Sequence, residues 1–121
     1  MATKDELDEA LADFAQRCNE NQRLRRMQRD WTRNILIRAT DNNIQHTMVV
    51  VKGYTTIEEG QTRPPDIIIT ADSELLCDMW WGDLNPAESY LQGTLKVQAT
   101  QEDIMRLDAV TAVIWGYGIT R

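Results

Sequence analysis

The sequence predicts an α+β domain built on a five-stranded, largely antiparallel sheet with helices packed on one face. Three observations support this prediction. Apolar residues recur at helical spacing in the N-terminal part, they alternate as in strands from residue 32 to residue 58, and strand-like and helix-like segments then follow one another between capping residues and glycines. At 121 residues, the chain is long enough for one domain with a buried core, so we expect a single domain over residues 1–121.

The N-terminal segment carries the signals of a helix start. Thr3 and Glu6 form a capping-box pattern, so we expect an amphipathic helix from about Lys4 to Asn19. Apolar residues then continue at helical spacing as far as Trp31, which predicts a short second helix or an extension of the first. The residues of the first helix that share one stripe are Leu7, Leu11, Phe14, Ala15 and Cys18.

A hairpin is predicted after Thr32. Ile35, Ile37 and Ala39 alternate with polar residues, which is typical of a strand with one core face and one wetter face. The sequence Asp-Asn-Asn at 41–43 favours a turn. The returning strand is expected at Gln45 to Lys52, the end or kink of that strand at Gly53, and a third strand at Tyr54 to Glu58.

The next strand is apolar on both faces. Pro64 and Pro65 cannot donate ladder hydrogen bonds, so they mark the entry from a loop onto Ile67, Ile68 and Ile69, which need cover on both sides.

Two helices and a fifth strand follow that strand. A helix starting at Ser73 ends near Gly82. In the next helix Asn85 can cap, Pro86 fits the first position, and Gly93 suits the left-handed position after the last turn. Residues 95–99 form the fifth strand.

The final helix, expected from Thr100 to Trp115, is apolar on two sides. Thr100 with Asp103 offers a cap, and Asp103, Arg106 and Asp108 are expected to form a solvated rim. A surface helix needs only one apolar stripe, so this helix would expose apolar area unless something covers it. Three explanations remain open: a bound lipid, a second protomer, or deep burial.

Three motifs carry a resemblance to a known family. They are Pro65-Asp66-Ile67-Ile68-Ile69-Thr70, Gly82-x-Leu84-Asn85-Pro86, and Tyr90-x-x-Gly93-x-Leu95-Lys96-Val97. Together with the order of the elements, they resemble the sterol carrier protein type-2 domain, a family of small lipid-carrying proteins, over nearly the whole chain. Two positions depart from the family pattern: Ala99 replaces a usual glycine, and Trp80-Trp81 replaces smaller aliphatic residues.

The resemblance implies an apolar cavity or tunnel between sheet and helices, with the C-terminal helix closing its mouth. It implies noncatalytic binding or carriage of fatty acids, fatty acyl-CoA or sterol-like molecules. The inward-facing candidates around the family-like motifs are Leu76, Met79, Trp80, Tyr90, Leu91, Leu95, Met105, Leu107, Val110 and Ile114. Two alternatives remain: a protein interaction or dimerisation module that uses the apolar last helix, and a small isomerase or hydratase with an acid such as Asp78 or Asp108 in the cavity.

Residues for catalysis or metal binding are sparse. His46 is the single histidine and has no acid or nucleophile at a telling spacing, so we expect no catalytic residue and no enzyme activity. Cys18 and Cys77 lie far apart and match no metal or redox spacing, so buried free thiols are expected. No glycine-rich phosphate loop is present, and we expect neither a cofactor nor a metal.

Charge and hydropathy bound the partners. The net charge of −6 argues against nonspecific nucleic-acid binding. No apolar run reaches the ~18 to 20 residues of a membrane-spanning helix, the N-terminus is unlike a signal peptide, and the C-terminal tetrapeptide 118–121 lacks a peroxisomal address. We therefore expect a soluble cytoplasmic protein with a lipid ligand, at most transient membrane contact, and a possible homodimer.

One short segment, residues 17–33, is rich in arginine. The predicted explanations are a solvated helix face, or a patch for a phosphate or carboxylate headgroup or for an anionic membrane surface. The six residues are Arg17, Arg23, Arg25, Arg26, Arg29 and Arg33.

Overall fold

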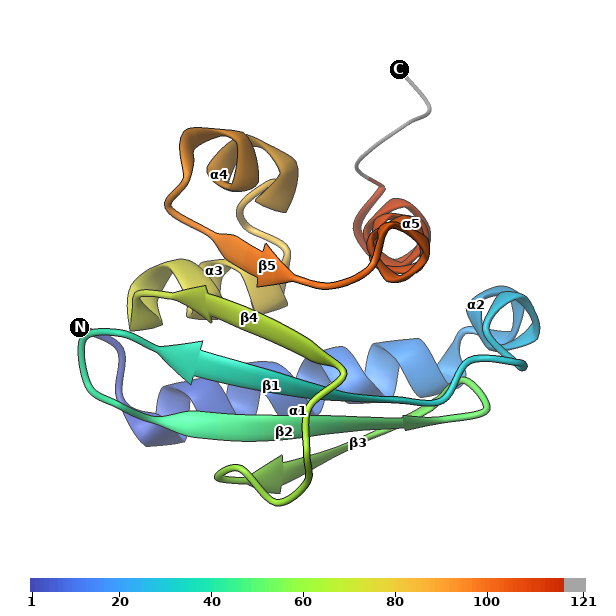
Figure 1. Ribbon diagram of the computed structural model, residues 1–121, viewed down its shortest axis with the longest axis horizontal. Helices are drawn as coiled ribbons and strands as arrows, with labels where there is room; N and C mark the ends of the chain where they lie inside the picture. The colour runs from blue at the N-terminus through green and yellow to red at the C-terminus, as the bar shows by residue number, and fades with distance from the viewer. Residues whose placement is uncertain (117–121) are drawn as a thin grey trace.

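A computed structural model describes residues 1–116 and confirms the α+β class. The N-terminal half contains α1 (Lys4–Glu20), α2 (Gln22–Met27), β1 (Arg33–Ala39), β2 (Gln45–Val51) and β3 (Tyr54–Glu59). The C-terminal half contains β4 (Ile67–Ala71), α3 (Ser73–Trp81), α4 (Pro86–Gln92), β5 (Lys96–Gln98), α5 (Gln101–Val110) and the π-helical turn η1 (Thr111–Trp115) (Figure 1). The tetrapeptide 118–121 lies outside the described residues. Within them, no helix has the length and apolarity needed to cross a membrane.

The sheet has the strand order β3-β2-β1-β4-β5. Three of its four pairings are antiparallel, as expected, and β1 with β4 is the one parallel pair. A parallel pair needs a crossover, and residues 60–66 provide it by passing across the face of β2 and β1 (Figure 1). Thr47 Oγ1 donates a hydrogen bond to the Gly60 carbonyl at 2.7 Å, which fixes this connection to the sheet.

The two faces of the sheet are covered differently. Ile35, Met48 and Ile67 occupy neighbouring positions on one face and pack under the helices. The opposite face carries Leu36, which is also buried, so the expected wetter face of this strand is only partly correct. The reason is the crossing connection, which covers that face where periodicity alone would leave it open to water.

The helix termini follow the capping chemistry of the sequence. Thr3 and Glu6 exchange both hydrogen bonds of the capping box, at 2.9 and 3.2 Å. Asn85 Oδ1 accepts from the Ala87 N–H at 3.0 Å, and Gly93 ends α4 with φ +84°. These predictions are confirmed, and they place β5 directly beside α4.

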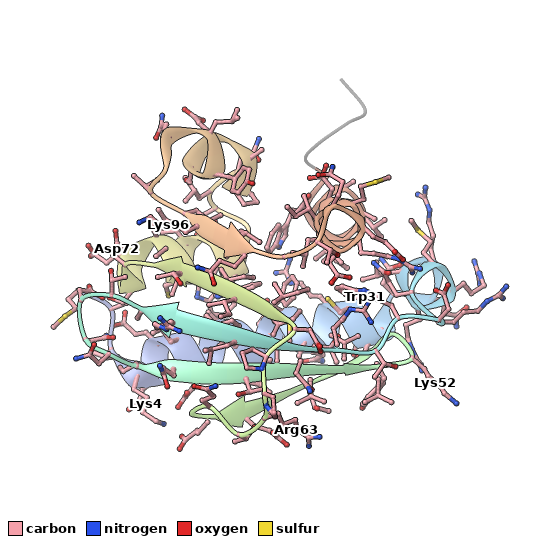
Figure 2. All side chains as sticks on the ribbon, in the orientation of Figure 1. Lys4, Trp31, Lys52, Arg63, Asp72 and Lys96 are labelled. Carbon is pink, nitrogen blue, oxygen red and sulfur yellow. The ribbon has the colours of Figure 1, made fainter. Side chains whose placement is uncertain are left out.

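The C-terminal helix differs from its prediction at Asp103. This carboxylate is buried and does not form part of a solvated rim with Arg106 and Asp108. Trp31 Nε1 donates to Asp103 Oδ1 at 2.9 Å, and Arg33 Nε donates to both carboxylate oxygens at 3.1 Å. Figure 2 shows Trp31 between α2 and α5. A buried carboxylate requires such donors, and here they come from residues about 70 positions earlier in the chain.

Candidate functional site

An apolar cavity of about 100 Å³ lies between the helix-covered face of the sheet and the helices. Its sheet side is formed by strand residues that alternate inwards, among them Ile35, Met48 and Ile69. Leu107 and Val110 of α5 lie across it, one turn apart on the same helix face. The position of α5 therefore determines whether this space is closed.

Three aromatic rings meet at one side of the cavity. The Phe14 ring centroid lies 4.9 Å from Trp80 and 5.2 Å from Trp115, and the two indoles are 6.3 Å apart. Such tilted contacts stabilise aromatic clusters by roughly 0.5–1.5 kcal/mol per pair beyond area burial. Trp115 belongs to the last turn of the C-terminal helix, so the cluster links that turn to α1 and α3.

Trp80 brings a polar atom to this apolar site. Its indole is buried, and Nε1 has no hydrogen-bond partner among the described residues. An unpaired buried N–H costs roughly 1–3 kcal/mol. An oxygen of a bound molecule that reached this N–H would recover part of that cost.

Polar contacts hold α5 over the cavity. Arg106 Nη1 donates to the Asp30 carboxylate at 2.8 Å, to the Met27 carbonyl at 3.1 Å and to Gln28 Oε1 at 3.0 Å. The Arg106 hydrogen bond lowers the pKa of Asp30. For Asp103, burial raises the pKa, but the hydrogen bonds from Trp31 and Arg33 outweigh it, so the pKa is lowered overall. Both carboxylates are thus anionic partners of the cations that position α5.

A second space, of about 300 Å³, is an apolar groove between α4 and α5. Tyr90 and Leu91 line its α4 side, and Ile104 and Asp108 lie on the α5 side. The groove and the cavity share lining residues, so they are adjacent spaces. The shared residues are Pro86, Leu95, Val97, Leu107 and Thr111.

The residues expected at the ligand site fall into three groups. Around the cavity lie Met79, Trp80, Leu95, Leu107 and Val110. Along the groove lie Tyr90 and Leu91, and Leu91 is 85% exposed. The remaining three are placed elsewhere: Leu76 is buried in the core, Ile114 borders a shallow depression beside Arg17, and Met105 is 64% exposed. Their role as ligand contacts stays a prediction.

Several cavity residues were not anticipated. Phe14 and Cys18 belong to the stripe predicted for the first helix, and that stripe could have indicated them. Trp31 and Trp115 lie far apart in the sequence, and tertiary packing brings both to the cavity: Trp31 contacts Asp103 of α5, and Trp115 contacts Phe14 of α1 and Trp80 of α3. No local pattern reveals that packing.

The two acids named as candidates for an isomerase lie outside the cavity. Asp78 and Asp108 are exposed, and the described residues that line the cavity include no carboxylate. His46 is buried in the sheet, with Nε2 2.6 Å from Asp8 Oδ1 of α1, and does not line the cavity. Burial raises the pKa of Asp8, whereas hydrogen bonds from His46 and Lys4 lower it, and the net shift is downward. Neither candidate acid lines the cavity, and Asp108 lies instead on the α5 side of the groove.

The cysteines are free, and the structure separates their environments. Cys18 is buried, and burial raises the pKa of its thiol to about 12. Cys77 is only partly buried, which corrects the expectation of two buried thiols. Within residues 1–116, no group of three or more His, Cys, Asp or Glu side chains is arranged to hold a metal ion.

Solved structures share this architecture at low sequence identity. The UbiJ-SCP2 ubiquinone synthesis protein aligns with a TM-score of 0.68 and 10% identity, covering 98% of this chain and 99% of that one. The chain has the sterol carrier protein 2 fold. Sterol carrier protein 2 of Aedes aegypti, solved in complex with the C16 fatty acid palmitate, aligns with a TM-score of 0.65 and 18% identity over 94% of this chain and 99% of that one.

The same fold also occurs inside a larger enzyme. The sec-alkyl sulfatase PisA1 of a Pseudomonas species aligns with a TM-score of 0.61 and 14% identity over 78% of this chain, which spans only 14% of that enzyme. No family model and no curated protein sequence matches the chain. The sterol carrier protein 2 fold is thus established by structure, while ligand and activity must be argued from the site.

Proposed function

We propose that this protein is a noncatalytic carrier of lipid-like molecules such as fatty acids, fatty acyl-CoA or sterol-like compounds. The observation that carries this proposal is the apolar cavity under α5, which adjoins the groove between α4 and α5. The palmitate complex of the Aedes aegypti protein supports it, because that chain has the same fold over nearly its whole length.

The size of the two spaces defines how a ligand would fit. The cavity of about 100 Å³ is smaller than the ~150 Å³ engineered cavity that binds benzene, so it holds only a short part of a chain while closed. Ligand sites usually measure roughly 300–1,000 Å³. A lipid tail would therefore pass Leu107 and continue into the groove, or displace α5 outwards.

Affinity follows from apolar burial. Each buried methylene contributes roughly 0.8 kcal/mol, so a ~12-carbon tail offers about 10 kcal/mol before costs. Lost motional freedom and side-chain ordering remove several kcal/mol, which gives low-micromolar affinity as the expected order of magnitude. Because methylenes carry little directional information, we expect weak selectivity among headgroups.

Native mass spectrometry of freshly purified protein, followed by organic extraction, tests the proposal directly. We expect a fraction of the protein to carry a mass that is released by solvent and identified as a lipid. The carrier proposal is wrong if the purified protein carries no lipid and also fails to bind a fluorescent fatty acid at a protein concentration of about 100 μM.

A matched pair of variants tests the location. Leu107→Trp adds an indole at the junction between cavity and groove, whereas Met105→Trp adds the same side chain two positions earlier, on the exposed side of α5. We expect palmitate affinity to fall about tenfold or more in Leu107→Trp and to stay unchanged in Met105→Trp. Equal affinities in the two variants would place the ligand elsewhere.

A second candidate function, an interaction or dimerisation module, has one observation in its favour. Leu91 and Met105 are exposed apolar side chains on α4 and α5, the two helices beside the groove. Sedimentation of the ligand-free protein distinguishes the candidates. A dimer through this surface would be lost in Met105→Ser, a position that lines neither the cavity nor the groove, while fatty-acid binding would persist.

A further inference from the structure

We propose that α2 and the turn between β2 and β3 form a docking surface for membranes that contain anionic lipids. This docking surface consists of the side chains of Arg23, Arg25, Arg26, Met27, Arg29, Val51, Lys52 and Tyr54. It goes beyond lipid carriage, because it concerns how the protein meets a membrane rather than what it holds inside.

The two parts of the docking surface are joined by contacts. The Gly53 N–H donates to the Trp31 carbonyl at 3.2 Å, and the Arg25 guanidinium lies 5.3 Å from the centroid of the Tyr54 ring. Figure 1 shows α2 and this turn at the same end of the molecule. Lys52 and Gly53 both have positive φ, which forms a tight hairpin turn with Lys52 at its tip. In Figure 2 the Lys52 side chain extends away from the fold.

The charge of this end is opposite to that of the whole chain. Arg23, Arg26, Arg29 and Lys52 are exposed and make no ion pair with any described residue. The acid that follows α2, Asp30, is already paired with Arg106. Arg29 also interacts electrostatically with Asp30, but Arg23, Arg26 and Lys52 have no such partner among the ion pairs of the described residues. A chain with net charge −6 therefore presents a basic surface at one end, which complements an anionic bilayer and would orient the protein towards it.

Apolar side chains are interspersed among these cations. Met27, Val51 and Tyr54 are 44%, 49% and 47% exposed, so each presents apolar area to solvent beside the cations. Apolar residues beside cations are the combination by which interfacial segments bind bilayers, since the cations contact headgroups and the apolar groups enter the acyl boundary. Because α2 and the β2–β3 turn lie at one end of the molecule and Lys52 extends from that end (Figure 1 and Figure 2), both parts can meet a flat anionic bilayer together.

The inner side of the same segments lines the cavity. Leu24, Gln28 and Gly53 contribute to its wall, and Gln28 also bonds Arg106 of α5. Docking through the outer side of these segments would therefore place the cavity wall and the contacts of α5 next to the headgroup layer.

Vesicle flotation without added ligand tests the proposal. We expect the protein to float with phosphatidylcholine vesicles that contain about 30% phosphatidylglycerol, not with pure phosphatidylcholine, and to be released as salt rises from about 0.1 to about 1 M. Binding to both vesicles alike, or to neither, would overturn the proposal. Because no ligand takes part, either result leaves the lipid-carrier proposal standing.

A charge-matched pair of variants identifies the surface. Arg26→Gln/Lys52→Asn removes two cations from the docking surface, with asparagine chosen because it tolerates positive φ. Arg38→Gln/Lys96→Gln removes two exposed cations from the sheet. We expect the first pair to weaken vesicle binding about 25-fold, at about fivefold per cation, and the second to change it less than threefold.

Two outcomes would overturn the assignment. Equal losses in both pairs would mean that only net charge matters. A loss of free palmitate affinity in Arg26→Gln/Lys52→Asn, with vesicle binding unchanged, would mean that the basic surface binds the headgroup of the carried ligand and not a bilayer.

Discussion

Gly82 and Gly93 end successive helices in the same backbone conformation, but they differ in their surroundings. Their φ values are +86° and +84°. A Cβ at position 93 would meet nothing within 4 Å, whereas a Cβ at position 82 would lie 2.7 Å from Cδ1 of Trp115. Substitution at position 93 therefore introduces backbone strain alone, whereas substitution at position 82 adds a steric clash with the C-terminal turn.

Replacement of each glycine by alanine is expected to give different losses of stability. Gly93→Ala should lower the free energy of unfolding by about 1–2 kcal/mol through left-handed strain alone. Gly82→Ala should cost more, because the Trp115 indole must also move. Urea titration measures both values. A neutral Gly93→Ala would contradict the assigned end of α4, and equal losses would contradict the contact between Gly82 and Trp115.

Asp103 is the residue whose protonation bears most directly on α5. Its folded-state pKa lies below the ordinary 3.8, because the hydrogen bonds from Trp31 and Arg33 outweigh burial. The anionic form is therefore favoured by folding. Its contribution to stability is present above about pH 3.8 and is lost as the pH falls towards the folded-state pKa.

The prediction for Asp103→Asn has a defined pH dependence. At pH 7 the variant should be less stable by roughly 2–3 kcal/mol, because a buried charged hydrogen-bonded group is lost. The difference between variant and wild type should shrink as the pH is lowered below about 3.8. Urea titrations at pH 7 and at about pH 3 measure it. If the difference in the free energy of unfolding stays constant over this range, protonation of Asp103 does not control the stability difference.

At the scale of elements, local chemistry was readable from the sequence and long-range packing was not. Capping residues and glycines predicted α3 and α4 to within a residue, because those signals act within one turn. The parallel pairing of β1 with β4 depends on the route of residues 60–66, which has no periodic signal. The buried Leu36 is a consequence of that route.

The candidate site shows the same division. Leu107 and Val110 were predicted from their place on the last helix, and they do lie at the cavity. Met105 met the same apolar criterion but is exposed, since a helix that is apolar on two sides does not reveal which side its neighbour covers. Leu91 of α4 is also exposed. Phe14 lies on the stripe predicted for the first helix but was not assigned to the cavity, and Trp31 reaches the cavity only through tertiary packing.

For the whole molecule, the C-terminal helix is the element that is held at both ends and that lines both the cavity and the groove. Polar contacts of Arg106 and Asp103 fix one end of this helix to β1 and to the segment that includes α2 and the residues after it. The aromatic contacts of Trp115 with Phe14 and Trp80 fix the other end. Three roles are open for this helix: a lid over the cavity, a protein interface, or a purely structural element. They predict different behaviour when the contacts at one end are removed.

Trp115→Ala releases the C-terminal end, and Trp81→Ala is the control, because Trp81 is also partly buried but does not line the cavity. For a lid, we expect a folded monomer that loses about 2 kcal/mol, below the ~3–5 of a fully buried tryptophan, and that releases a fluorescent fatty acid several-fold faster. A protein interface instead predicts a change in sedimenting mass at constant release rate. A structural helix predicts equal release rates in Trp115→Ala and Trp81→Ala, because stability alone would then be affected. Stopped-flow fluorescence measures the release rate of the fatty acid, sedimentation measures the mass, and a thermal melt measures stability, so the three measurements on the two variants distinguish these outcomes. The shared lining of cavity and groove favours the first, since Leu107 and Thr111 of the C-terminal helix border both spaces.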